Sequence, residues 1–217
     1  MAAVKREAST WNNWCLTPLV SDPVLALLAG LVLFLGVHSV RIVADGWRSA
    51  QIARIGALPW RGLYSLASLV GLVLIVWGYG QARLDPVILW NPPAWTRYVT
   101  SLLVLPAFIL IVAGNLRGTK MKAALGHPMV LGTKVWAFAH LLSNGTLADV
   151  VLFGGFLAWA IVDYASARRR DRAAGTVYPP GSMSRDAVAI VIGVAAWVVF
   201  GWWLHGPLIG VRPFVGA

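Results

Sequence analysis

The chain has 217 residues, of which 59% are hydrophobic and 12% are charged, and its mean hydropathy is +0.72. Soluble domains are about 45–50% apolar and about 25% charged, so this composition excludes soluble globular, disordered and collagen-like proteins. The one cysteine, Cys15, excludes an intramolecular disulfide, a four-cysteine zinc site and an iron–sulfur cluster within the chain. We therefore predict an all-α, polytopic transmembrane helical bundle in contact with membrane lipid.

The chain carries 18 Lys and Arg residues against 8 Asp and Glu residues. Such an excess is typical of nucleic-acid binding or of membrane topology signals. The basic residues here lie in short loops between apolar runs, which favours topology and gives no reason to expect nucleic acid. In residues 1–22, Lys5 and Arg6 are followed by the segment Trp11-Asn12-Asn13-Trp14 and not by the apolar run of a signal peptide. We expect an outer, periplasmic segment with no cleavable signal peptide.

Five apolar runs reach the length of about 17–25 residues that a helix needs to cross a bilayer. A sixth run is shorter and contains Lys134 and His140, so its alternative is a re-entrant or interfacial helix. Pro128 before this run and Gly145 after it are helix start and stop signals. The six predicted spans are Pro23–Val43, Gly62–Gly80, Tyr98–Gly114, Met129–Leu142, Leu147–Tyr164 and Ala187–Leu204.

The distribution of basic residues favours six spans. Six spans bring all Lys and Arg residues to one side of the membrane except Lys5, Arg6, Arg83, Arg97 and Arg212. The positive-inside rule makes that side cytoplasmic and places both termini outside. Residues 23–205 are then one transmembrane domain, and residues 206–217 form a C-terminal tail. We expect residues 44–58 to lie along the inner surface as an amphipathic helix.

Few residues within the spans are able to carry chemistry. Asp149 and Asp163 fall near the two ends of their span, and no carboxylate falls at mid-membrane, which argues against a carboxylate proton relay. The sequence has no G-x-S-x-G nucleophile motif and no Walker or dinucleotide-binding glycine pattern. These absences leave no support for hydrolases, kinases or dehydrogenases of the soluble type. Four histidines remain: His38, His127, His140 and His205.

His38 shares one helix face with Gly30 and Phe34, at intervals of four residues. A histidine in a membrane bundle serves as a haem ligand, a metal ligand or a buried hydrogen-bonding group. The glycine leaves room either for a flat macrocycle or for a neighbouring helix. Arg41 follows on the same face and is suited either to a haem propionate or to the membrane interface.

His140 shares its helix face with Trp136 and Asn144. Asn144 or a backbone carbonyl would fix the imidazole tautomer as a metal ligand requires, although a histidine hydrogen-bonded in the bundle core is the alternative. By helix rise, His38 and His140 differ in depth by about 10 Å. His127 is expected as a loop residue, and His205 as an interfacial residue at the outer boundary.

Several short motifs resemble the NnrU family, and this resemblance extends from about Leu25 to Tyr164. The pattern His-Pro…Trp…His-Leu-Leu-x-Asn-Gly is the most specific part of it. The matching segments are Gly36–Ser39, Gly114–Asn115 with the basic loop to Lys122, Gly126–Met129 with Gly132 and Trp136, and His140–Gly145.

The resemblance implies a small bacterial inner-membrane protein associated with nitric oxide metabolism and denitrification. The family is related to the haem b-dependent 15-cis-zeta-carotene isomerase, in which histidines ligate the haem. By this resemblance, His38 and His140 are the expected axial ligands of a haem b, with His127 in reserve. Arg41, Arg48 or Lys134 would lie near the propionates, and Trp136 and Asn144 near the haem.

Three functions follow as hypotheses. The first is a haem b-binding NnrU-type protein that carries out redox chemistry or that senses or handles nitric oxide. The second is a cis–trans isomerase of an apolar, zeta-carotene-like polyene. The third is a cofactor-free assembly or partner subunit of a membrane respiratory complex. Whether the protein is an enzyme, and whether it forms a homo-oligomer, stays open at the level of the sequence.

Overall fold

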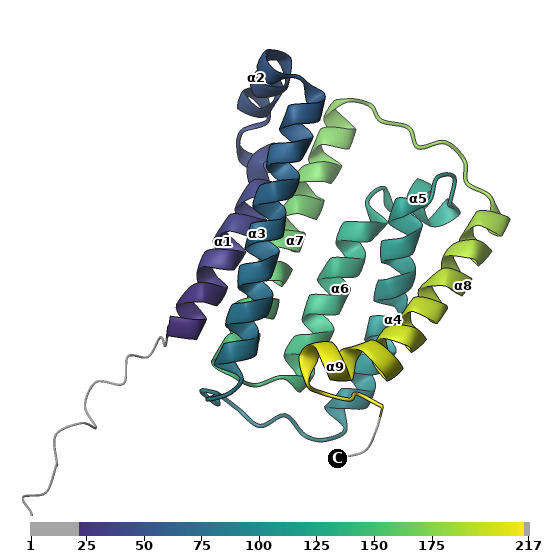
Figure 1. Cartoon of the computed structure of the whole chain (residues 1–217). Coiled ribbons are helices and arrows are strands. Elements are labelled where there is room, and N and C mark those ends of the chain that lie inside the picture. The colour runs from purple at the N-terminus through teal and green to yellow at the C-terminus, as the bar shows by residue number, and fades with distance from the viewer. Residues whose placement is uncertain (1–21, 215–217) are drawn as a thin grey trace, which may run out of the picture.

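Six long helices stand side by side in the computed structural model, which describes residues 22–214 (Figure 1). They pack in the order α3–α1–α7–α6–α4–α8, so the bundle is a curved row and not a ring. The long helices are α1 (Asp22–Val43), α3 (Ala57–Ala82), α4 (Thr96–Asn115), α6 (Pro128–Ser143), α7 (Leu147–Ala173) and α8 (Met183–Val199). Shorter elements are α2 (Asp45–Ile55), α5 (Lys120–Leu125), the π-helical turn η1 (Phe200–Leu204) and α9 (His205–Ile209).

The prediction of a polytopic helical bundle is confirmed. Within the described part of the chain, five helices are long and apolar enough to cross a membrane, namely α1, α3, α4, α7 and the continuous run α8–η1–α9. Their side chains towards the surroundings are largely aliphatic, as at Val32, Leu102 and Val191, each about 70% exposed. A surface of this kind is stable only against lipid, so the exposed apolar residues identify the lipid-facing surface.

The sixth predicted span, α6, has only 16 residues, about 24 Å at 1.5 Å per residue. It nevertheless runs antiparallel along most of α4. Near its start Met129 lies against Gly114, and near its end the hydroxyl of Thr100 donates to the carbonyl of Ala139 at 2.8 Å. Because α6 packs between α4 and α7, protein covers most of it, and it does not need the length of a lipid-facing helix.

Glycines set the close helix contacts. A Cβ on Gly30 would lie 2.7 Å from the backbone nitrogen of Ile75 in α3, and one on Gly71 would lie 2.8 Å from that of Phe34 in α1. Gly132 of α6 meets the carbonyl of Ala107 in α4 in the same way. Small residues of this kind let membrane helices approach closely. The space at Gly30 is thus filled by a neighbouring helix and not by a macrocycle.

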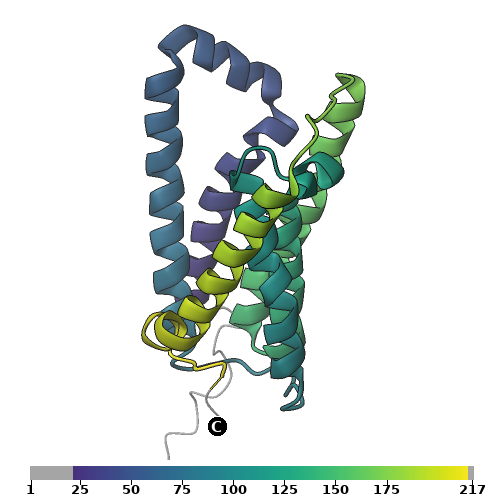
Figure 2. The same ribbon diagram turned by 90° about the vertical axis from the view of Figure 1, so that its right-hand side faces the viewer.

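The two ends of the bundle differ in charge. The basic end carries α2, α5 and the α7–α8 loop, with backbone pairing between Thr119 and Ser182, and α2 extends across it as an exposed helix (Figure 2). Among the described basic residues, those of the opposite end are Arg83, Arg97 and Arg212. The chain enters at Asp22 and leaves beyond α9 at this opposite end, which the positive-inside rule makes the outer end.

The predicted outer segment 1–22 lies almost wholly outside the described residues. Residues 206–214, expected as a tail, continue through α9 and then return towards α8. The guanidinium of Arg83, the residue directly after α3, donates to the carbonyl of Ile209, which attaches this C-terminal segment to the far side of the bundle. The C-terminal segment thus crosses the outer end of the bundle.

Candidate cofactor pocket

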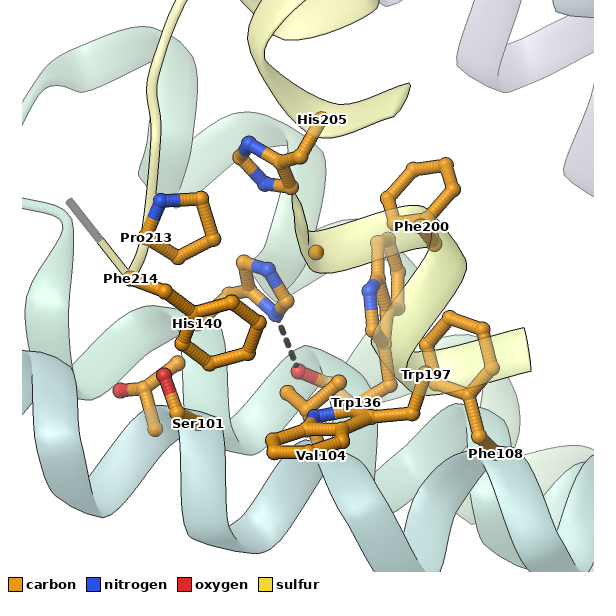
Figure 3. Close-up of a pocket in the computed structure, with 12 residues that line it drawn as sticks. Ser101, Val104, Phe108, Trp136, His140, Trp197, Phe200, His205, Pro213 and Phe214 are labelled. Atoms are coloured by element: carbon orange, nitrogen blue, oxygen red, sulfur yellow. Dashed lines mark hydrogen bonds between the residues drawn. The ribbon is translucent and has the colours of Figure 1, made fainter. Parts of the chain in front are cut away.

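A pocket with a cavity volume of about 60 Å³ lies between α4, α6 and the C-terminal segment, towards the outer end of the bundle. Its walls are mainly aromatic, and it contains two histidines (Figure 3). The lining residues are Thr100, Ser101, Val104 and Phe108 of α4, Trp136 and His140 of α6, and Trp197, Phe200, Gly201, His205, Pro213 and Phe214 of the C-terminal region.

His140 is held so that one ring nitrogen is free for a ligand. Its Nδ1–H donates to the carbonyl of Trp136, one helical turn earlier, at 2.9 Å. The ring stacks on Phe153 with centroids 4.7 Å apart and lies tilted against Trp136 at 5.1 Å. In a neutral imidazole, a proton on Nδ1 that bonds to the carbonyl leaves Nε2 with its lone pair. A hydrogen-bonded imidazole with a free nitrogen is the usual form of a metal-ligating histidine.

His205 lies on the same pocket as His140, although it belongs to none of the motifs identified in the sequence. Its Nδ1–H donates to the carbonyl of Val211 at 2.7 Å, as that of His140 does to Trp136. His205 directly follows the π-helical turn η1. The proximity of two histidines 65 positions apart depends on the packing of α8 and α6 against α4, which no local pattern indicates.

His38 occupies a different position, in an aromatic cage between α1, α3 and α7. Its ring stacks on Phe34 at 4.3 Å and lies 5.1 Å from Tyr64 and 6.1 Å from Trp159. Its Nδ1–H donates to the carbonyl of Phe34 at 2.7 Å. In form, His38 is therefore prepared as a ligand in the same way as His140.

The structure does not bring His38 and His140 together. A column of three aromatic rings, those of Phe34, Phe156 and Trp136, stands between them, with neighbouring centroids 5.8 and 5.6 Å apart. Along α7, His38 lies beside Trp159 and His140 beside Phe153, a difference in depth of about 9 Å at 1.5 Å per residue. The depth difference expected from the sequence is therefore present, and tilt does not remove it.

His127, the reserve candidate, lies at the opposite, basic end of the bundle. Its Nε2 is 2.9 Å from Oδ2 of Asp171, and the hydroxyl of Tyr178 donates to the same oxygen at 2.8 Å. Arg168 lies 3.6 Å from that carboxylate oxygen. Burial, followed by the hydrogen bond to Asp171, raises the pKa of the Tyr178 phenol. This cluster fastens the α7–α8 loop to the start of α6, so His127 has a structural role in this arrangement.

The other expected site residues divide between the two ends. Trp136 lines the pocket, and its carbonyl, not Asn144, fixes the tautomer of His140. Asn144 caps the end of α6 and donates to the backbone carbonyl of His140 at 2.7 Å. Arg41 and Arg48 lie 3.9 and 3.6 Å from Asp45 at the basic end, away from the pocket. Lys134 lies on α6 but does not line the pocket.

Asp149, near the outer end of α7, is only 5% exposed and has a structural role. Its carboxylate accepts hydrogen bonds from the hydroxyl of Tyr79 at 2.7 Å and from the backbone N–H and hydroxyl of Thr146 at 2.9 and 2.7 Å. Thr146 in turn accepts from the backbone N–H of Asp149, which completes a capping box at the start of α7. The buried carboxylate is thus well satisfied by its protein partners.

Within residues 22–214, no group of three or more His, Cys, Asp or Glu side chains is close enough to hold a metal ion. What the pocket does offer is a pair of imidazoles with free Nε2 atoms among flat aromatic walls. Fold and pocket together define a polytopic helical membrane protein with a histidine-containing aromatic pocket at its outer end.

The family model described as NnrU protein matches residues 26–213, which is most of the chain. The chain belongs to the NnrU family, and the resemblance of its motifs is thereby confirmed and extends through the C-terminal region. No curated protein and no solved structure matches it.

Proposed function

We propose that this protein binds haem b in the outer pocket, where His140 would hold it. The observation that carries the proposal is the state of His140: Nδ1–H is committed to the carbonyl of Trp136, and Nε2 is left free beside an aromatic pocket. The hydrogen bond to the carbonyl orients the ring and increases its basicity, as is usual for histidines that bind metals.

The side chains that line the pocket suit a haem better than a bare metal ion, and the cavity of about 60 Å³ would have to widen to admit one. A bare ion takes most of its ligands from the protein, and the described chain has no cluster of three candidate ligands. A haem brings four nitrogens of its own, so one or two histidines complete its coordination. The rings of Trp136, Trp197, Phe200 and Phe214 provide apolar walls for a flat macrocycle.

Two arginines are available for the carboxylates of such a group. Arg97 lies on α4 one turn before Ser101, and its Nε is buried with no hydrogen-bond partner among the described residues. Arg212 directly precedes Pro213 and Phe214 of the pocket wall. Their position at the outer end suits propionates that emerge from this pocket, whereas Arg41 and Arg48 lie at the other end.

When bound, haem supplies an iron that changes oxidation state or binds a small ligand such as nitric oxide. Nε2 of His140 would hold that iron, the aromatic side chains of the pocket would exclude water, and the two arginines would neutralise the carboxylates. We therefore assign the protein a redox or nitric oxide-handling role in the bacterial inner membrane. The NnrU resemblance supports this assignment, and the pocket supports the haem.

The absorption spectrum of the detergent-purified full chain, oxidised and dithionite-reduced, tests the proposal together with a pyridine haemochrome assay. We expect about one b-type haem per chain, and His140→Ala is expected to lose most of it because a principal ligand is removed. His127→Ala is the matched control, since it deletes an imidazole at the opposite end of the bundle. A protein that stays colourless after haem reconstitution, or an unchanged spectrum in His140→Ala, would overturn the proposal.

A further inference from the structure

We propose that an anionic phospholipid of the inner leaflet binds in a groove between α1 and α7, with one acyl chain along the groove and its phosphate at Arg169. The groove has a cavity volume of about 430 Å³ and shares no lining residue with the outer pocket. Six residues of α1 between Val32 and Val43 form one wall, and Ala158, Trp159 and Val162 of α7 form the other. The proposal is therefore independent of the proposed haem.

Small residues open this groove on the surface of the bundle. Gly36 and Ser39 of α1 face Ala158 of α7 across it. A Cβ on Gly36 would meet nothing within 4 Å, so the space beside this glycine is not filled by a neighbouring helix. Val32 and Val43, at the two ends of the α1 wall, are 73% and 80% exposed. Because the bilayer core contains no water, an apolar groove that opens to it is filled by hydrocarbon.

The groove has the length of one membrane leaflet. From Val32 to Val43, α1 rises about 16 Å at 1.5 Å per residue. Half of a hydrocarbon core of about 30 Å is about 15 Å. Val43 is the last residue of α1, and this helix ends at the basic, inner end of the bundle (Figure 1). The groove therefore extends from mid-membrane to the inner interface, as one acyl chain of an inner-leaflet lipid does.

Arg169 continues the α7 wall of the groove beyond its apolar part. Ala158, Val162, Ala165 and Arg169 follow one another at intervals of three or four residues and are all exposed, so they form one stripe along α7. Side chains of a helix lean towards its N-terminus, which for Arg169 is the direction of the groove. Ala165, which lies between them, has too small a side chain to block the guanidinium.

The depth of Arg169 matches a lipid headgroup. The rings of His38 in α1 and Trp159 in α7 lie 6.1 Å apart, so these two residues are at about the same depth. Val43 and Tyr164 each follow five residues later and are level at the inner end of the groove. Arg169 lies about 8 Å further along α7. The headgroup region adds about 5–7 Å to each side of the hydrocarbon core, so Arg169 lies at the level of the phosphate.

The charge of Arg169 favours an anionic lipid over the other occupants of such a groove. Arg168 lies 3.6 Å from the carboxylate of Asp171, and Arg170 donates to the hydroxyl of Ser166 at 2.7 Å. Arg169 has no ion-pair partner anywhere in residues 22–214. Basic residues at the inner surface attract anionic headgroups. A second copy of the chain would bring its own basic end to the same level, and like charges would oppose the contact.

The test is native mass spectrometry of the delipidated, detergent-purified full chain, titrated with phosphatidylglycerol or with zwitterionic phosphatidylethanolamine. We expect one phosphatidylglycerol to bind about fivefold more tightly than phosphatidylethanolamine, the effect of one basic residue near an anionic group. Arg169→Ala is expected to lose this preference and Arg169→Lys to keep it. Arg54→Ala is the matched control, because it removes an exposed arginine of α2 at the same end of the bundle but outside the groove.

A second pair of variants tests the groove itself. Gly36→Leu is expected to fill the groove and to weaken binding of both lipids at least fivefold, because the leucine side chain takes the place of the acyl chain. The added side chain meets no neighbouring helix, so the fold is expected to persist. Gly62→Leu is the matched control, since a Cβ on Gly62 of α3 also meets nothing within 4 Å and Gly62 does not line the groove.

Three results would overturn the proposal. The first is equal affinity of wild type for the two lipids. The second is an equal change in Arg169→Ala and Arg54→Ala, or phosphatidylglycerol binding by Gly36→Leu as tight as that by Gly62→Leu. The third is a wild-type dimer that Gly36→Leu converts to a monomer, which would assign the groove to a second copy of the chain.

Discussion

At the scale of single residues, buried polar groups in this bundle differ in how well they are partnered. Among the described residues, Nε of Arg97 and Nε1 of Trp159 are buried without a hydrogen-bond partner. Asp149 is the opposite case, because Tyr79 and Thr146 together donate three hydrogen bonds to its carboxylate. A buried charge that loses a donor has no water to replace it. The hydroxyl of Tyr79 is therefore expected to stabilise the folded protein through its hydrogen bond to Asp149.

Tyr79→Phe is expected to destabilise the protein by about 1–3 kcal/mol, the usual cost of removing one partner from a buried hydrogen bond. The measurement is the free energy of unfolding or the melting temperature in detergent. Tyr98→Phe is the matched control, because it makes the same chemical change at a residue that is 64% exposed. Equal melting temperatures for the two variants would show that the contact with Asp149 contributes nothing.

At the scale of helices, close packing of α1 on α3 depends on positions that have no side chain. A Cβ on Gly78 would lie 2.5 Å from the backbone nitrogen of Leu27 and 2.9 Å from the carbonyl of Pro23. The obstacles are backbone atoms, which do not move as the end of a flexible side chain does. By contrast, Gly80 on the same helix has open space around it.

Gly78→Ala is expected to push α1 away from α3 and to cost about 1–3 kcal/mol, as overpacking of a filled interior usually does. Gly80→Ala is expected to be neutral or stabilising by up to about 1 kcal/mol, because alanine favours the helix more than glycine does. Denaturant titration of both variants in the same detergent measures the difference. A Gly78→Ala protein as stable as Gly80→Ala would mean that these helices are not held as closely as described.

At the scale of the whole molecule, the six helices place nearly all described basic residues at one end and the pocket at the other. The positive-inside rule assigns the basic end to the inner side of the membrane, so the pocket lies towards the outer side. This orientation has a direct consequence for the loops. Leu84, at the pocket end, and Val177, at the basic end, are 78% and 89% exposed.

Single cysteines at these two positions test the orientation in a Cys15→Ser background. A membrane-impermeant maleimide added to intact spheroplasts is expected to label Leu84→Cys and to leave Val177→Cys unlabelled, because only the first faces the reagent. Permeabilised membranes provide the control, since both variants should react there. Labelling of Val177→Cys alone in intact spheroplasts would invert the topology and place the pocket on the inner side.

Much of the fold could be predicted from the sequence because hydropathy and charge are local properties. The span predicted at 23–43 is the helix Asp22–Val43, and the short run 129–142 is the helix Pro128–Ser143. The predicted positions of helix ends were less accurate. The span predicted at Gly62–Gly80 is the central part of the longer helix Ala57–Ala82. A bilayer requires a minimum apolar length but sets no limit on how far a helix extends beyond it.

The candidate site could be predicted only in part. The spacing of Trp136 and His140 placed both on one helix face, and both line the pocket. His205 gave no such signal, because its place on the pocket depends on a π-helical turn and on a chain reversal at Gly210. Whether His38 ligates haem stays a prediction, and the structure places it on the far side of an aromatic column.

The sequence by itself determined that this is a multi-pass membrane protein of the NnrU family. It also determined which segments are helices that span the membrane and which loops carry the basic residues. These features follow from the energetics of apolar length and of charge at a bilayer, which act on each segment separately. Only the tertiary structure decided which histidines line the same pocket. That choice depends on how α4, α6 and the C-terminal segment pack, and packing is a property of residues far apart in the chain.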